Sequence, residues 1–487
     1  MSRKFVGLFI LFGLLLLGSS FFSFSALAKE NKNISEHQIL SSQAPLPPSS
    51  GEAEEKSSEQ MEPEEAVHHP VWDPPLWSTI GFALMLLAIA VIPLAAEKWW
   101  ESNLNKAIVA LILAIPFGAY ILLQDWHSLA HEMHEYISFI VLLGSLFVIS
   151  GGIYLHGNIY ASPRNNTILL AVGTLLASFI GTTGSAMLLI RPVITTNSNR
   201  KYVVHTIIFF IFLVANIGGS LTPLGDPPLF MGYLRGVPFV WTFRLWEMWL
   251  PTSALLLTIY YLLDSYLWRK ESDEAKKWDE KYEIPLKLHG KINFLWLAGV
   301  VAIIYFGTPS PWRELGMIAL SLISWFTTPK GVREAHHFTF NPIIEVAVLF
   351  FGIFVTMVPA LQLLRLHGAE LGVTQPWHFF WMTGSLSSFL DNTPTYLVFL
   401  SLAEGLNLPP DVVLHSGAGI SHIILEAISC GAVFMGANTY IGNGPNFMVK
   451  AIAEENGIKM PSFFGYMLWS VGILFPIFVL VTLVFFI

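Results

Sequence analysis

Two stretches of the chain place glycine, proline and oxygen-bearing side chains inside apolar surroundings. One is segment 215–228, ANIGGSLTPLGDPP, and the other is segment 435–446, MGANTYIGNGPN. Glycine and proline at this density interrupt a helix and free its backbone carbonyl groups. A single interruption of this kind is more often a kink or a surface loop than a site. Two of them, with Asn216 adding a side-chain oxygen, predict an oxygen-lined site for a hard cation such as Na⁺.

Two further apolar stretches, 167–196 and 376–405, carry turn-forming residues at their centres. The first centre reads GTTGS (181–185) and the second reads DNTPT (391–395). Each arm is too short to cross a bilayer alone, so both stretches are predicted to be re-entrant hairpins, which membranes allow where protein or a cavity satisfies the backbone. Helices that start at these tips would point the positive ends of their dipoles inward. Only the second tip carries an acid.

Charged side chains inside apolar segments are costly and indicate function by default. The candidates are Asp391, Asp226, Glu345, Glu426 and Arg191, with His205, His415 and His422 as titratable neighbours. Glu345 lies near a helix start where water is close, Arg191 could serve only to neutralise a carboxylate, and the histidines could be packing residues. Asp391 is the strongest candidate because it lies at a hairpin tip, where a carboxylate could release a proton when Na⁺ arrives.

The amino-acid composition indicates whether these elements lie in water or in a lipid bilayer. Of the 487 residues, 54% are hydrophobic and 12% are charged, against about 25% charged in an ordinary soluble domain. The chain is therefore predicted to be an all-α membrane protein. One cysteine excludes a disulfide framework, no HExxH or GxSxG motif indicates an enzyme, and nothing indicates nucleic-acid binding.

Ten apolar segments have the length of about 17–25 residues that a membrane helix needs. They are approximately 77–96, 105–123, 135–156, 203–232, 245–267, 292–308, 314–328, 341–364, 412–448 and 462–486. Three spans, a hairpin, a broken span and one more span fill 77–267, and the same order fills 292–486. Each unit crosses five times, and because five is odd, the second unit is predicted to be inverted relative to the first. The fold class is thus an inverted-topology repeat with about ten transmembrane helices, two re-entrant hairpins and two broken helices.

The N-terminus predicts the orientation. Residues 1–28 read as a signal peptide, with Arg3 and Lys4 before a short apolar run and an Ala-Leu-Ala cleavage site. Residues 29–76 read as a disordered extracytoplasmic tail. The loops then predicted to be cytoplasmic hold 16 Lys and Arg against four on the other side, which agrees with the positive-inside rule. The linker 268–291 would be cytoplasmic, between a first repeat at 77–267 and a second at 292–487, in the inner membrane.

The motifs GSLTPLGDPPLF, DNTP and GANTYIGNGPN resemble those of the ion-transporter superfamily, most closely NhaD-type sodium/proton antiporters and related citrate carriers. The resemblance covers about residues 75–487. It implies two cation sites, each formed by a hairpin tip and its broken helix. One would use Thr182, Thr183, Ser185, Asn216 and Gly218. The other would use Asp391, Asn392, Thr393, Ala437 and Asn438. It also implies a homodimer.

The function predicted from the sequence is Na⁺/H⁺ antiport, with Na⁺ at Asp391, Asn392 and Asn216. Asp226 or Glu426 would supply a second proton-carrying carboxylate. The alternative is a cation-coupled citrate or dicarboxylate carrier, in which Arg191 would contact the substrate anion. The superfamily's carboxylate carriers place a Ser-Asn-Thr triplet at each tip, and both tips here depart from it. The expected partners are Na⁺, H⁺ and membrane lipids, with no cofactor beyond the transported ions.

Overall fold

The computed structural model describes residues 72–273, 276, 285–335, 338–406 and 408–487. The predicted signal peptide 1–28 and the predicted tail before residue 72 lie outside the described residues. So do residues 274–275 and 277–284 of the predicted linker. Residues 74–369 and 373–487 form one compact unit, and the description below concerns that unit.

Long apolar helices dominate the described part of the chain, where five helices are long and apolar enough to cross a membrane. They contain α2 (Ile80–Ala95), α4 (Asn103–Gln124), α5 (Trp126–Ser150), α15 (Asn341–His367) and α20 (Phe463–Val481). On α4, the side chains of Ile112 and Leu123 are 65% and 83% exposed. An apolar surface of this kind suits lipid, so the prediction of an all-α, multi-pass membrane protein is confirmed.

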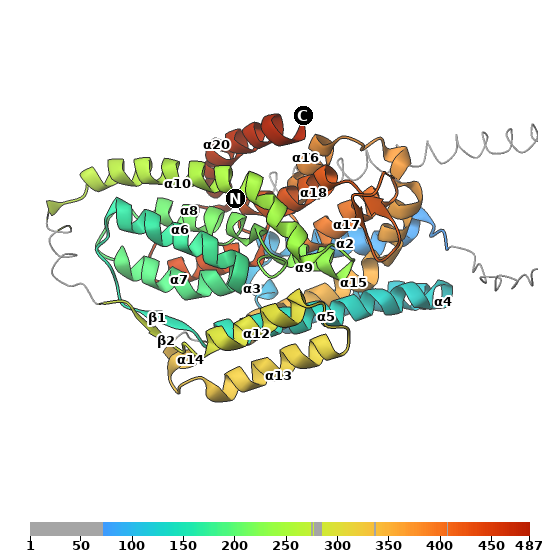
Figure 1. Cartoon of the computed structure of the whole chain (residues 1–487), viewed down its shortest axis with the longest axis horizontal. Helices are drawn as coiled ribbons and strands as arrows, with labels where there is room; N and C mark the ends of the chain where they lie inside the picture. The colour runs from blue at the N-terminus through green and yellow to red at the C-terminus, as the bar shows by residue number, and fades with distance from the viewer. Residues whose placement is uncertain (1–71, 274–275, 277–284, 336–337, 407) are drawn as a thin grey trace, which may run out of the picture. The chain divides into compact units, whose positions relative to one another are not determined.

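The remaining elements are shorter or less apolar. The helices are α3 (Glu97–Trp100), α10 (Trp246–Arg269), α12 (Asn293–Tyr305), α13 (Trp312–Thr327) and α14 (Val332–Ala335). The tighter or wider helical turns are η1 (Leu76–Thr79), η3 (Phe239–Leu245), η4 (Gly368–Leu371) and η6 (Thr482–Phe486). Figure 1 shows α12 and α13 beside α5, against which both pack. The count of ten crossings stays a prediction.

Helix α15 lies at the centre of one group of helices, because it packs against α2, α4 and α5. Phe350 stacks on Phe139 of α5 with ring centroids 4.9 Å apart. At Gly352 the helices approach so closely that an added Cβ would lie 2.8 Å from Met85 and 3.1 Å from Ala110. Gly352 therefore belongs to a helix crossing and not to a lipid-facing stretch.

Helix α5 starts at Trp126, which corrects the predicted start at residue 135. Asp125 caps the helix by accepting a hydrogen bond from the Ser128 N–H at 3.1 Å. The apolar pattern missed the turns before residue 135 because they contain Glu132 and three histidines, and the predicted segment itself began at a second acid, Glu135. The structure pairs both acids with Arg235, which allows them to lie buried in the helix.

Both predicted hairpins are present as pairs of helices. The first joins α6 (Pro163–Ile180) to α7 (Thr182–Thr196) through Gly181, whose φ of +81° favours glycine. The second joins α16 (Pro376–Ser387) to α17 (Asn392–Glu404). Figure 1 shows α6 and α7 lying side by side.

Both predicted broken helices are interrupted where the sequence indicated. The first consists of α8 (Val204–Leu213), the short turn η2 (Ile217–Ser220) and α9 (Pro227–Leu234). The second consists of α18 (His422–Met435), η5 (Gly436–Asn438) and α19 (Gly444–Glu455). The predicted apolar segment 412–448 begins instead with a small antiparallel pair, β3 (Val412–Val413) with β4 (Gly419–Ile420). A second antiparallel pair, β1 (Tyr154–His156) with β2 (Lys287–His289), forms after α5 ends.

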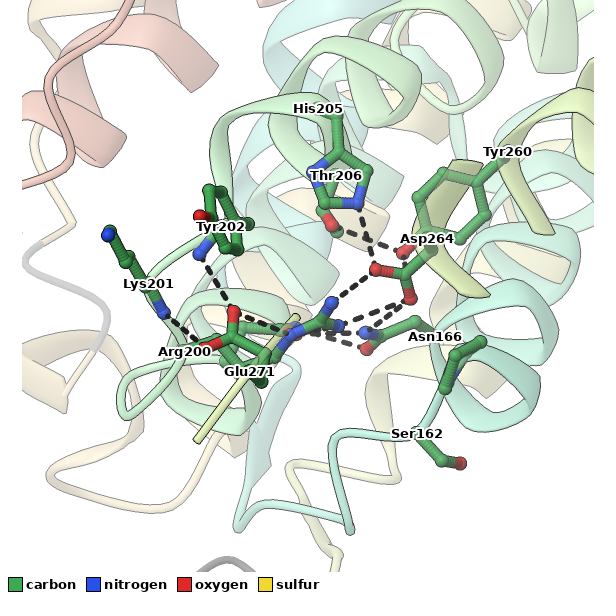
Figure 2. Close-up of polar contacts among 12 residues, drawn as sticks. Ser162, Asn166, Arg200, Lys201, Tyr202, His205, Thr206, Tyr260, Asp264 and Glu271 are labelled. Atoms are coloured by element: carbon green, nitrogen blue, oxygen red, sulfur yellow. Dashed lines mark hydrogen bonds and ion pairs between the residues drawn. The ribbon is translucent and has the colours of Figure 1, made fainter. Parts of the chain in front are cut away.

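A buried network of charges ties the base of the first hairpin to α10 (Figure 2). Arg200, which follows α7, pairs with Asp264 of α10, and both side chains are fully buried. The His205 Nε2 atom lies 2.8 Å from the Asp264 carboxylate, and Asn166 of α6 donates to Asn197 at 2.8 Å. Because Asp264 pairs with Arg200 and lies within hydrogen-bond distance of His205, this network stabilises the frame that holds the hairpin.

Candidate ion-binding site

The side chain of Asp226 is the point where all four interruptions of the chain meet. Asp226 precedes α9 and is 1% exposed. Its carboxylate accepts hydrogen bonds from the Thr182 hydroxyl at 2.9 Å, the Asn392 amide at 2.5 Å and the Asn443 amide at 3.2 Å. The three donors come from the first hairpin tip, the second hairpin tip and the second break. The structure thus gathers segments from both halves around one acid.

The local sequence explains why the backbone can bring Asp226 there. Gly225 packs on Gly219 so tightly that an added Cβ would lie 2.1 Å from the Gly219 carbonyl oxygen. Only glycine allows that approach. The Thr182 N–H donates to the Gly225 carbonyl at 2.8 Å, which fastens the hairpin tip to the break. Two prolines then start α9, so the buried start of that helix lacks two N–H groups that would need partners.

The second break has a threonine that makes the same pair of hydrogen bonds as the threonine of the first break. Thr222 donates to the Ser178 carbonyl and accepts from the Leu224 N–H at 3.2 Å. Thr439 donates to the Ser388 carbonyl at 2.5 Å and accepts from the Ile441 N–H at 3.2 Å. Asn443 occupies the position in the second break that Asp226 occupies in the first, and it lies 217 residues later in the chain. The two breaks therefore have the same local fold and differ in one charge.

The side chains that hydrogen-bond to Asp226 are polar but uncharged. Within the described ranges, no lysine, arginine or histidine forms an ion pair with its carboxylate. Asn216 extends the hydrogen-bond network around Asp226. Its amide oxygen accepts from Asn443 at 3.3 Å, and its amide nitrogen donates to Asn446 at 2.7 Å. A buried carboxylate without a counter-charge costs several kcal/mol. A bound proton or cation would remove that cost.

A cavity of about 90 Å³ lies next to the carboxylate. A single water needs about 10–15 Å³ on the same measure, so the cavity has the volume of one small ion or a few waters. Asp226, Thr182 and Thr183 line one side of it, and apolar side chains such as Leu142 and Ile343 form most of the remaining wall. The roles of Thr182 and Thr183 as cation ligands stay predictions.

The other predicted ligands of the first site hold the hairpin together. The Ser185 hydroxyl donates to the Gly173 carbonyl at 2.9 Å, within the hairpin. The Gly218 carbonyl accepts from the Ser178 hydroxyl at 2.5 Å. An added Cβ at Gly218 would lie 2.6 Å from the Thr174 carbonyl oxygen. Ser185 and Gly218 therefore position the site and have their own hydrogen bonds already made.

Asp391, the acid favoured by the sequence, caps a helix. Its carboxylate accepts from the Thr393 N–H at 3.1 Å, at the start of α17. The neighbouring Asn392, and not Asp391, hydrogen-bonds to Asp226. The Ala437 carbonyl accepts from Tyr466 at 2.8 Å and the Asn438 amide donates to Ser388 at 2.9 Å, so neither of these hydrogen bonds involves the Asp391 carboxylate. No hydrogen bond among the described residues joins the second predicted set around a common centre.

The remaining charged candidates have separate contacts. Glu426 pairs with Arg244 at 3.0 Å, and Glu345 pairs with Lys106 at 2.8 Å. His205 belongs to the network of Figure 2, and His422 accepts from the Trp241 indole N–H at 2.9 Å. Arg191 is half-buried on α7. Glu426 is thus a surface-side partner of Arg244 and does not contact Asp226.

Asn443 and Thr439 are site residues that the sequence reasoning missed. Their signal was present in the sequence. Residues 219–230 and 436–447 both fit the pattern G-x-x-T-x-x-G-[D/N]-x-P-x-F. Aligning the two breaks by this pattern pairs Asp226 with Asn443 and Thr222 with Thr439.

The chain matches the family described as "Putative citrate transport" over residues 72–486. The chain belongs to this family. A comparison with curated proteins gave no significant match. The matched range includes both hairpins, both breaks and Asp226, so the family relationship concerns the whole helical region. With its apolar helices, the family match identifies a multi-pass membrane transporter.

Proposed function

We propose that this member of the citrate-transport family carries citrate or a similar carboxylate across the cytoplasmic membrane, coupled to a cation that binds at Asp226. The observation that carries the proposal is the buried, uncompensated carboxylate at the meeting point of both hairpins and both breaks. The family match supports citrate as the substrate class. Carboxylate transport was the alternative prediction from the sequence, and the family match favours it over Na⁺/H⁺ antiport.

The matched contacts of the two breaks support the inverted repeat. Thr222 and Thr439 make the same pair of hydrogen bonds, and Gly225 and Gly442 make the same close approach to a glycine carbonyl. We propose that the two units cross the membrane in opposite directions, with about ten crossings in total. In this arrangement Asp226 lies near the axis that relates the units, where transporters bind their ions and substrates.

The coupling follows from charge. A citrate carboxylate about 4 Å from a fixed anion is repelled by about 4 kcal/mol at an effective dielectric constant of 20. Na⁺ or H⁺ on Asp226 removes this repulsion, so anion entry and cation binding become linked. The amide groups of Asn392 and Asn443 suit this exchange, because an amide that rotates presents an oxygen in place of its N–H₂ group. Thr182 and Thr183 supply hydroxyl oxygens beside the same cavity.

Na⁺/H⁺ antiport is the second candidate, and one observation favours it. The residues that contact Asp226 include no cationic side chain that would hold a substrate anion. An antiporter needs only a carboxylate that binds either ion. In that case Asp226 would be the exchanging group, with Asp391 as a neighbouring acid.

Reconstituted liposomes separate the two functions. An inward Na⁺ or H⁺ gradient should drive uptake of labelled citrate by the wild type, and Asp226→Asn should reduce that uptake to background. Glu426→Gln removes an acid that pairs with Arg244 and does not contact Asp226, so this matched control should keep the uptake. Na⁺-driven proton movement without citrate uptake would replace citrate transport with antiport. Citrate uptake that survives Asp226→Asn would refute the assignment of the coupling site.

A further inference from the structure

A second cavity lies at the other end of α9 from Asp226. Its volume is about 450 Å³, and it is bounded by the first half of α5, the end of α9 and the loop between α12 and α13. Small-molecule sites typically have volumes of about 300–1,000 Å³. No residue lines both this cavity and the smaller one beside Asp226. The space is therefore a separate cleft of the size of a small ligand.

Nitrogen-bearing side chains converge on this histidine cleft, named here for the imidazoles that line it. They are His131, His134, His415 and Arg313. All three imidazoles are exposed to solvent, and that of His131 is 59% exposed. Imidazoles gain a positive charge between about pH 8 and pH 5. A guanidinium with charged imidazoles around it is suited to bind several carboxylates at once.

The acids around the cleft are already paired. Glu135 lines the cleft, and its carboxylate lies 3.0 Å from Arg235 and 3.2 Å from His131. Glu132, behind it, binds the same Arg235 at 2.7 Å. On the opposite wall, Glu314 accepts from Arg313 at 2.7 Å. Each of these three acids thus has an arginine partner, although the Glu314 Oε2 atom accepts no hydrogen bond from the described residues.

The charge of the cleft depends on its imidazoles. With neutral imidazoles, two acids of α5 face one cation, Arg235, and the Arg313–Glu314 pair is neutral. The pair of Arg365 with Glu404 lies nearby and is neutral too, while Tyr233 is uncharged near neutral pH. The net charge is then −1, and protonation of all three imidazoles changes it to positive. Each imidazole that takes up a proton would therefore make the cleft more attractive to anions.

One short helix joins the cleft to the coupling site. Helix α9 starts after Asp226 and ends at Leu234, which lines the cleft. Eight helical residues span about 12 Å. An anion held in the cleft would lie close to Asp226 without touching it.

We propose that the histidine cleft is a docking site for polycarboxylate anions, held by Arg313 and the protonated imidazoles. The choice of citrate as the anion rests on the proposed function. The cleft itself rests on its own geometry, because Asp226 is no part of it. A docked anion is expected to precede the coupled step at Asp226.

Equilibrium binding of labelled citrate to the purified full-length protein in detergent tests the proposal without requiring transport. Binding to the wild type should be at least about tenfold tighter at about pH 6 than at about pH 8. The double variant His134→Gln with His415→Gln should lose that gain, since both side chains are exposed and can be changed without disturbing the core. His156→Gln, an exposed histidine of β1, is the matched control and should bind as the wild type does.

Four results would overturn the proposed docking site. Binding that the double variant leaves unchanged would place citrate elsewhere, while transport through Asp226 could still stand. Equal binding of the uncharged trimethyl ester of citrate would show that charge plays no part. Complete loss of binding in Asp226→Asn would show that the only anion site includes Asp226. Absence of citrate binding at both pH values, with Na⁺/H⁺ exchange intact, would refute the cleft and the citrate function together.

Discussion

Two buried aspartates with opposite surroundings provide a sharp test of the site. Asp226 and Asp264 are 1% and 0% exposed, and each accepts several hydrogen bonds. Asp226 has only neutral donors, whereas Asp264 contacts Arg200 and His205. The same change, aspartate to asparagine, removes one negative charge from each place. We expect the two variants to have opposite effects on stability and function.

Asp264→Asn should greatly lower the free energy of unfolding. Removing one partner of a buried ion pair leaves Arg200 with only its longer contact to Glu271, at 3.9 Å, and costs about 3–5 kcal/mol. At about 2 °C per kcal/mol, the melting temperature should fall by roughly 6–10 °C.

For Asp226→Asn the contributions oppose each other. Three hydrogen bonds to a charged acceptor become neutral, which loses about 1 kcal/mol each. Relief of the uncompensated charge returns several kcal/mol. The free energy of unfolding should therefore stay within about 1 kcal/mol of the wild type or rise above it, while transport is lost.

Thermal unfolding in detergent, with and without Na⁺, measures both effects. Na⁺ at 100 times its dissociation constant should stabilise the wild type by about 2.7 kcal/mol, and it should stabilise Asp264→Asn equally. It should not stabilise Asp226→Asn. If Asp226→Asn unfolds as early as Asp264→Asn, the carboxylate of Asp226 is a structural group. If Na⁺ still stabilises that variant, the cation binds elsewhere.

Three further predictions follow from particular contacts. Gly218→Leu should abolish transport, because its Cβ would lie 2.6 Å from a carbonyl oxygen. Gly472→Leu on α20 should be tolerated, because an added Cβ there has no heavy atom within 4 Å. Equal activity of the two variants in uptake assays would contradict the packing argument. Gly352 is unsuitable as the control because it lies at a helix crossing. Asp391→Asn keeps a good helix cap and should retain more transport than Asp226→Asn; the reverse order would restore Asp391 as the coupling acid. A cysteine at Ser272, in a chain with Cys430→Ala, should react with an impermeant thiol reagent only from the cytoplasmic side, and labelling from outside would overturn the predicted topology.

The sequence determined the features that depend on local chemistry. Apolar runs indicated membrane helices because about 20 apolar residues match the thickness of a bilayer. Glycine and proline located both breaks, since these residues interrupt a helix wherever they cluster. The turn at Gly181 located the first hairpin for the same reason. Each of these features depends on residues that are neighbours in the chain.

Only the tertiary structure decided which acid lies at the centre. The donors to Asp226 are 44, 166 and 217 residues away in the chain, and no local pattern encodes contacts of that separation. The sequence therefore favoured Asp391, which carries the more conspicuous turn motif and in the fold caps a helix. The early start of α5 has the same cause, because Glu132 and Glu135 can be buried only where Arg235, about 100 residues later, reaches them. Pairings between distant segments decide which polar groups are compensated, and the uncompensated one is the candidate for binding an ion.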